Sequence, residues 1–140
     1  MATSKYYTPE IEEFHVGFEY EVEDLGDNGI TRVWRPQIFE GEETRTYFTE
    51  ELKEGEMRVK YLDKSDIQDL GWVYAEDRGM SEANGYMFRK PQKVFAKGFY
   101  KLRFWKNTNR VSIEATHGAL FSGIIKNKSE LKKLLKQLGI

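Results

Sequence analysis

Apolar and polar residues alternate most strictly between Phe14 and Glu23. A period of two places successive side chains on opposite faces of a strand. One face then carries Phe14, Val16, Phe18, Tyr20 and Val22, and the other carries Glu19, Glu21 and Glu23. The pattern therefore predicts a half-buried strand whose second face is acidic and solvated, which discourages pairing between sheet edges.

Two more strands are predicted in the first half of the chain. Residues 26–29, Gly-Asp-Asn-Gly, form a turn because these residue types tolerate a positive φ. Residues 31–39 then form a second strand, in which Pro36 lacks a backbone donor and indicates an edge strand or a bulge. Residues 57–62 alternate in the same way and are predicted to form a third strand.

A second hairpin is predicted between residues 100 and 115. On its first arm the apolar residues Tyr100, Leu102 and Phe104 alternate with Lys101, Arg103 and Trp105. The last three should therefore share one face of the strand. Residues 107–109, Asn-Thr-Asn, reverse the chain, and short apolar strands are predicted at 72–74, 86–88 and 120–125.

Two helices are predicted, a short one near the middle and a longer one at the C-terminus. Ser65 and Gln68 have the spacing of a capping box, and Gly71 suits the left-handed residue that ends a helix. The C-terminal helix has leucines at i, i+3, i+4 and i+7, namely Leu131, Leu134, Leu135 and Leu138. Asn127 or Ser129 can cap it.

Strands and helices do not alternate regularly along the chain, which favours an α+β fold over a parallel α/β fold. We expect a mainly antiparallel sheet, with the short middle helix and the C-terminal amphipathic helix packed on one face. At 140 residues and 16.5 kDa the chain fits a single domain over residues 1–140, with residues 1–9 flexible.

Composition excludes several kinds of chemistry. The chain has no cysteine, which excludes disulfides, a thiol nucleophile and Cys-ligated metal sites. No apolar run approaches the roughly 20 residues of a membrane span, and the first residues lack the apolar stretch of a signal peptide. We therefore expect the protein to act in the cytoplasm and not at a membrane.

The net charge of −1 hides an asymmetry between the two halves. Residues 1–70 carry 8 Lys and Arg against 18 Asp and Glu, whereas residues 71–140 carry 14 against 5. In one interpretation both halves supply strands to one sheet, where opposite charges face each other. In the other, the basic half contacts a phosphate-bearing partner and the acidic half maintains solubility.

Motifs of catalysis are nearly absent. The sequence has no glycine-rich phosphate loop and no nucleophile elbow. The histidines His15 and His117 stand far apart, and their spacing does not indicate a metal site. We therefore expect no catalytic residues, no metal and no cofactor, and we interpret the protein as a binding protein and not an enzyme.

The predicted basic hairpin is the strongest candidate for a binding site. Cationic side chains beside an exposed indole can pair with phosphates and stack on a base. The candidates are Lys101, Arg103, Trp105, Lys106 and Arg110, with a second cluster formed by Arg32, Trp34 and Arg35. The alternative is that Trp105 covers the surface of the sheet and the cations only solubilise it.

Several segments, taken together, resemble a group of phage proteins. They are residues 6–14 (YYTPEIEEF), 17–21 (GFEYE), 57–63 (MRVKYLD), 66–67, 70–72 (LGW) and the end of the chain, 123–131 and 139–140. This set is similar to small uncharacterised proteins encoded by phages and prophages of Bacteroides-type gut bacteria. The resemblance implies an accessory role in the cytoplasm of a host cell, and it supplies no catalytic residues.

Three functions remain open from the sequence. The first is a phage accessory protein that sequesters a small anionic host molecule, such as a signalling nucleotide, or a host defence protein. The second is a nucleic-acid-binding module, which the acidic half would oppose by repelling a long polyanion. The third is a virion or assembly component that acts through protein contacts. A homodimer formed through exposed sheet edges is also expected.

Overall fold

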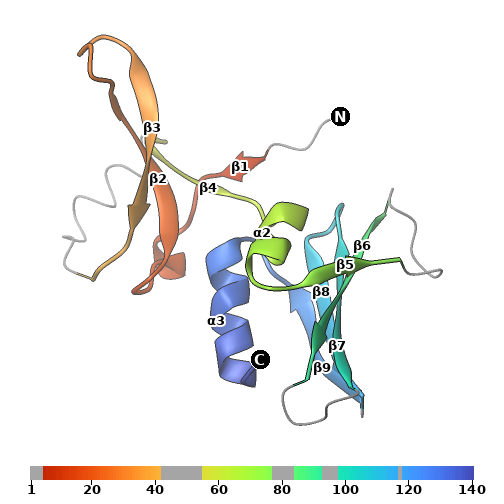
Figure 1. Ribbon diagram of the computed structural model, residues 1–140. Helices are drawn as coiled ribbons and strands as arrows, with labels where there is room; N and C mark the ends of the chain where they lie inside the picture. Colours follow the sequence, from red (N-terminus) through yellow and green to blue (C-terminus); the bar gives the residue numbers. More distant parts are fainter. Residues whose placement is uncertain (1–4, 42–54, 77–83, 93–97, 117) are drawn as a thin grey trace. The chain divides into compact units, whose positions relative to one another are not determined.

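The computed structural model describes residues 5–41, 55–76, 84–92, 98–116 and 118–140 (Figure 1). The chain divides into two compact units, which we call the N-terminal unit (residues 1–61) and the C-terminal unit (residues 62–140). Each unit has its own sheet and its own cluster of buried residues. The expectation of a single domain stays a prediction, and each unit is described by itself below.

The N-terminal unit is built on a four-stranded antiparallel sheet. Its strands are β1 (Tyr6–Tyr7), β2 (Glu19–Leu25), β3 (Arg32–Ile38) and β4 (Met57–Lys60), in the order β1-β4-β2-β3, and a short 3-10 helix, η1, spans Ile11–Glu13. Phe18, Tyr20, Met57 and Val59 form its buried core. Tyr6 and Tyr7, which were expected to be flexible, pair with β4.

The strand predicted to begin at Phe14 begins instead at Glu19. The backbone N–H of Phe18 donates to the carbonyl of His15 at 2.9 Å, and Gly17 has a φ of 93°, so the chain turns here. Val16, expected on the apolar face, is 74% exposed. Phe14 still reaches the core, with its ring centroid 4.9 Å from that of Phe18. The alternation therefore predicted burial correctly at most positions but not the start of the strand.

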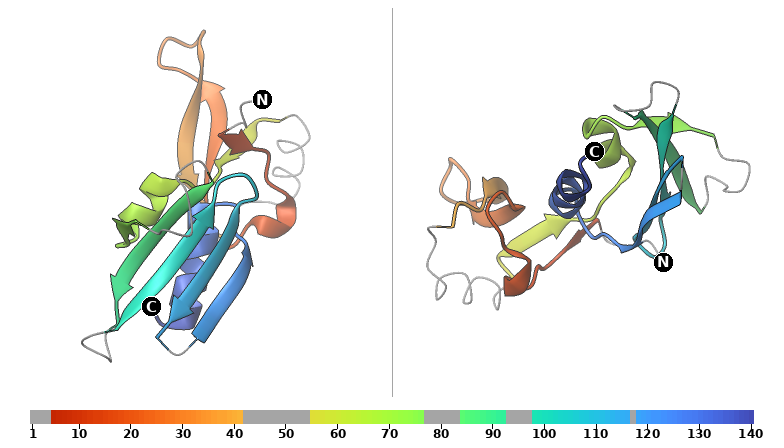
Figure 2. Two further views of the ribbon diagram at one scale, coloured as in Figure 1. Left: turned by 90° about the vertical axis from the view of Figure 1, so that its right-hand side faces the viewer. Right: turned by 90° about the horizontal axis from the view of Figure 1, so that it is seen from below.

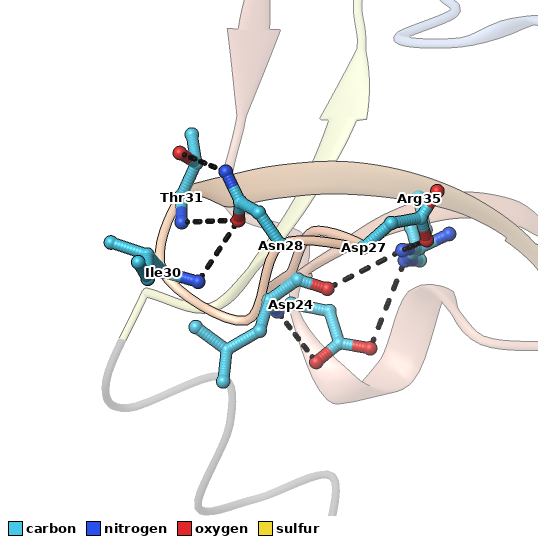
Figure 3. A network of polar contacts seen from close by, with 7 residues as sticks. Asp24, Asp27, Asn28, Ile30, Thr31 and Arg35 are labelled. Atoms are coloured by element: carbon cyan, nitrogen blue, oxygen red, sulfur yellow. Dashed lines mark hydrogen bonds and ion pairs between the residues drawn. The ribbon is translucent and has the colours of Figure 1, made fainter.

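The turn between β2 and β3 is stabilised by Asn28 (Figure 3). Its side-chain oxygen accepts the backbone N–H groups of Ile30 and Thr31, each at 2.9 Å, and its amide nitrogen donates to the Thr31 hydroxyl at 3.0 Å. An Asn side chain used in this way closes a tight reversal. Pro36 lies in β3, which is an edge strand. This is one of the two alternatives predicted from the sequence, the other being a bulge.

The C-terminal unit is built on a five-stranded antiparallel sheet whose strand order follows the chain. The strands are β5 (Val73–Ala75), β6 (Gly85–Pro91), β7 (Phe99–Trp105), β8 (Arg110–Ala115) and β9 (Gly118–Ile124), and the helices are α2 (Lys64–Asp69) and α3 (Lys128–Leu138). Both helices lie on the same side of this sheet (Figure 2). Leu131 and Leu135 of α3 share a buried cluster with Leu102, Phe104, Val111 and Ile113 of the sheet.

Both helices begin at a side chain that caps the helix. Asn127 caps α3 by accepting the N–H of Glu130 at 2.8 Å, and Gly139 ends it with a φ of 75°. The cap predicted at Ser65 is wrong. Asp63 caps α2 instead, because its carboxylate accepts the N–H of Asp66 at 2.9 Å, while the Asp66 carboxylate accepts the N–H of Asp63.

The predicted α+β class with mainly antiparallel strands is confirmed. The sheet, however, is not one sheet to which both halves contribute. In the described part of the chain the strands up to Lys60 pair only with one another, and so do those from Val73 onward. The interpretation in which acidic and basic strands face each other across a shared sheet is therefore wrong. None of the described helices is long and apolar enough to cross a membrane.

Candidate functional site

The candidate site is the face of the five-stranded sheet that is turned away from α2 and α3, which we call the outer face (Figure 2). Strand β7 runs through the middle of this sheet. Its residues Leu102 and Phe104 are buried in the helix-covered core, so the residues between them point to the other side. The outer face of β7 therefore carries Phe99, Lys101, Arg103 and Trp105.

Neighbouring strands extend the outer face on both sides of β7. Arg89 of β6 lies opposite Lys101, and Arg110 of β8 lies opposite Trp105. Phe99 is 47% exposed, and Lys101, Arg89 and Arg110 are also exposed. Phe99 was not among the residues predicted from the sequence, although the same alternation leads to it. Arg89 could not be predicted to lie beside Lys101, because the pairing between β6 and β7 determines that position.

Glu114 of β8 neutralises part of this basic surface. Its Oε1 atom lies 3.0 Å from Nη1 of Arg103, and its backbone lies opposite Lys101 in the register. The Arg103 side chain is 25% exposed and that of Glu114 is 42% exposed. A pair this accessible to water contributes only about 0.2–1 kcal/mol, so an incoming anion can compete with Glu114 for the guanidinium.

The centre of the outer face is packed and is not bare backbone. Met87 lies on this side, because its neighbours Tyr86 and Phe88 pack in or against the helix-covered core, and yet it is only 4% exposed. Met87 lies opposite Arg103 in the register. Trp105, on the same strand as Arg103, is half-buried. Such packing restricts the rotamers of Arg103 and Trp105 and lowers the entropy that a ligand contact must overcome.

Lys106 and Arg110 flank the turn, and the structure separates them. Nη2 of Arg110 donates to the Ser122 hydroxyl of β9 at 2.8 Å, on the outer face. Lys106 is turned toward Tyr86, with its Nζ atom 4.4 Å from the ring centroid. Tyr86 packs against the helix-covered core. Lys106 therefore does not belong to the outer face; it lies on the helix-covered side, which it shares with Leu102 and Phe104 at intervals of two residues.

The second predicted cluster is divided between the two faces of the four-stranded sheet. Arg32 and Trp34 share one face, whereas Arg35 points to the other. There Arg35 lies 3.9 Å from an Asp24 oxygen and 3.5 Å from an Asp27 oxygen (Figure 3). This cluster belongs to the N-terminal unit and the basic hairpin to the C-terminal unit.

The guanidinium of Arg58 covers one face of the Trp34 indole. Its Cζ atom lies 4.2 Å from the Trp34 ring centroid and 3.7 Å from that of Tyr6. The contact is a cation–π stack within the protein. That side of the indole is therefore closed to a base, which makes Trp34 a weaker candidate than Trp105.

The acidic face of β2 is not simply solvated, contrary to the expectation. Glu21 accepts two hydrogen bonds from Arg58, at 3.1 and 3.3 Å, and both side chains are about three-quarters buried. Glu23 lies 3.7 Å from Arg32. The glutamates thus hold the cations of neighbouring strands. Within the described residues no group of three or more His, Asp or Glu side chains is placed to hold a metal ion, and His117 lies outside those residues.

The division into units sharpens the charge asymmetry. The N-terminal unit has 7 Lys and Arg against 15 Asp and Glu, a formal charge of −8. The C-terminal unit has 15 against 8, a charge of +7, so the two values sum to the net −1. The outer face therefore belongs to a basic unit, whose field attracts anions at low ionic strength.

Comparison of the chain with models of protein families, with curated proteins and with solved structures finds no match. The resemblance to phage proteins thus stays an interpretation of the sequence.

Proposed function

We propose that the protein is a non-enzymatic binding protein whose outer face takes an anionic partner that carries aromatic bases. A host nucleotide is the partner that this chemistry fits best. In the setting that the phage resemblance implies, an accessory protein in the host cytoplasm sequesters such a molecule. The setting is part of the proposal and rests on the sequence alone.

The observation that carries the proposal is the row Phe99, Lys101, Arg103 and Trp105 on the outer face of β7. Alternate residues on a strand lie about 6.6 Å apart, so the row extends over about 20 Å. Its ends are aromatic and its middle is cationic. A base stacked on Trp105 or Phe99 leaves its phosphate within reach of Arg103 or Lys101, and stacking contributes about 1–3 kcal/mol per base.

A single strand of nucleic acid is the second candidate. It is favoured by the same row, because a linear array of aromatic and basic side chains on an open sheet accepts an extended chain of bases. The acidic N-terminal unit opposes this candidate by repelling long polyanions. Binding of a single strand would weaken steeply with salt, whereas a mononucleotide releases fewer counterions and responds less.

The experiment is a binding panel on the full chain at low and moderate salt. Melting temperature is measured with mono- and dinucleotides and with short single-stranded DNA and RNA, and each ligand that shifts it is titrated. The double variant Arg103→Ala with Trp105→Ala should lose at least tenfold in affinity, because it removes a charged hydrogen bond of about 1.5–3 kcal/mol and a stacked base.

Lys132→Ala is the matched control, because Lys132 is an exposed cation on α3, on the other side of the sheet. It should leave affinity unchanged. Full affinity in a folded double variant would show that the outer face is not the site. If no nucleotide or oligonucleotide binds, the nucleotide proposal fails. The expected partner is then a protein, such as a host defence or virion protein.

A further inference from the structure

Among the described residues the two sheets have four edge strands, and three of them carry features that discourage pairing with another chain. β1 has two residues and β5 has three, which is too short for a stable ladder. β3 has seven residues but includes Arg32, Arg35 and Pro36. Short length, charge and proline are the devices by which natural proteins protect exposed edges.

The fourth edge strand, β9, has none of these three features, although its pairing with β8 shifts register at Leu120, between the pairs Ile113–Phe121 and Glu114–Ala119. It spans seven residues, Gly-Ala-Leu-Phe-Ser-Gly-Ile, with no charged residue and no proline. In the described part of the chain, its backbone ladder is formed with β8 alone. Leu120 and Ile124 are among the exposed large apolar side chains, at 42% and 61%. A long, uncharged and partly apolar edge is a template for another strand.

We propose that a second copy of this chain pairs antiparallel with β9 about a two-fold axis, so that two five-stranded sheets join edge to edge. A second copy is the occupant that the strand itself favours. Because β9 has no charge, its copy meets it without like-charge repulsion, and a two-fold contact uses the same residues on both sides. An axis at Ser122 places Leu120 opposite Ile124 of the second copy. The two-fold symmetry repeats this contact, so Leu120 and Ile124 of both copies become buried.

Salt separates this contact from anion binding on the outer face. Raising the salt should weaken anion binding, because salt screens the attraction of the cations for the ligand. Pairing through β9 should change little, because this strand has no charged residue and pairs through backbone hydrogen bonds and apolar contacts.

The test is the mass of the full chain in solution, measured by sedimentation or light scattering over a range of concentrations and salt. The expected mass approaches twice 16.5 kDa at high micromolar concentration. Ile124→Glu should return the protein to a monomer. The introduced carboxylate lies opposite Arg110 of its own sheet, so the monomer is expected to fold normally, which its melting temperature checks.

Ile38→Lys is the matched control, because Ile38 is 58% exposed on the protected edge strand β3 and lies opposite Glu19. It should leave the dimer intact. A monomeric wild-type protein at every concentration would overturn the proposal. So would an Ile124→Glu variant that stays dimeric, or a dimer that Ile38→Lys disrupts. Nucleotide binding by a monomeric Ile124→Glu variant would leave the proposed function standing.

Discussion

Arg58 and Glu21 lie 37 residues apart in the sequence and form a two-pronged ion pair, with Nε 3.1 Å from Oε1 and Nη2 3.3 Å from Oε2. Their strands pair so that the two residues are direct neighbours. The guanidinium also makes cation–π contacts with the rings of Tyr6 and Trp34. Arg58 therefore joins β1, β2 and β3 to its own strand, β4, on the face opposite the core.

Arg58→Ala should destabilise the N-terminal unit by about 2–3 kcal/mol, since it removes charged hydrogen bonds and two cation–π contacts. Arg58→Lys should recover only part of this loss, because an ammonium cannot make the planar fork. Urea unfolding followed by tryptophan fluorescence gives the free energy. Arg32→Ala is the control, because its 3.7 Å pair with Glu23 is exposed and should contribute less than about 1 kcal/mol. Equal losses in the two alanine variants would contradict this account.

Glu114→Gln should tighten the binding of an anionic ligand about two- to fivefold. The substitution frees Arg103 from a pair that contributes about 0.2–1 kcal/mol. Titration of the nucleotide identified by the panel measures the change. Glu76→Gln removes the same charge from the C-terminal unit at an exposed position after β5, so it controls for net charge. An identical gain in both variants would mean that Arg103 is not specifically involved.

Leu131→Ala should destabilise the C-terminal unit by about 2–5 kcal/mol, the usual cost of truncating a fully buried leucine. Leu131 is inaccessible to water and belongs to the same buried cluster as Leu102 and Phe104 of β7. Thermal and urea unfolding give the change, with Lys132→Ala as the neighbouring exposed control. If Leu131→Ala melts like the control, α3 does not stabilise the sheet to the extent that its burial indicates.

The sequence predicted features that depend on local periodicity. Strict alternation on β7 placed Lys101, Arg103 and Trp105 on one face, and leucine spacing located α3. Both patterns are read within a single element, where geometry alone determines which side chains share a side.

Features that depend on contacts between elements could not be predicted. Glu114 neutralises Arg103 because β8 pairs with β7 in one register, and a shift of one residue would turn Glu114 to the other face. The pairing of Glu21 with Arg58 requires β4 to lie beside β2, although β3 lies between them in the sequence. Lys106 was included among the candidates because it flanks the turn, although the alternation of Leu102 and Phe104 assigns it to the helix-covered side.

The two units complete their buried cores at different stages of synthesis on the ribosome. The core residues of the N-terminal unit are complete once Val59 has emerged, so this unit can fold while the rest of the chain is made. The five strands of the other sheet form ladders between sequence neighbours and can pair early. Their apolar side, with Val111 and Ile113, is covered by α2 alone until Leu131 and Leu135 have left the exit tunnel. In that interval the nascent chain is most exposed to aggregation and to chaperones.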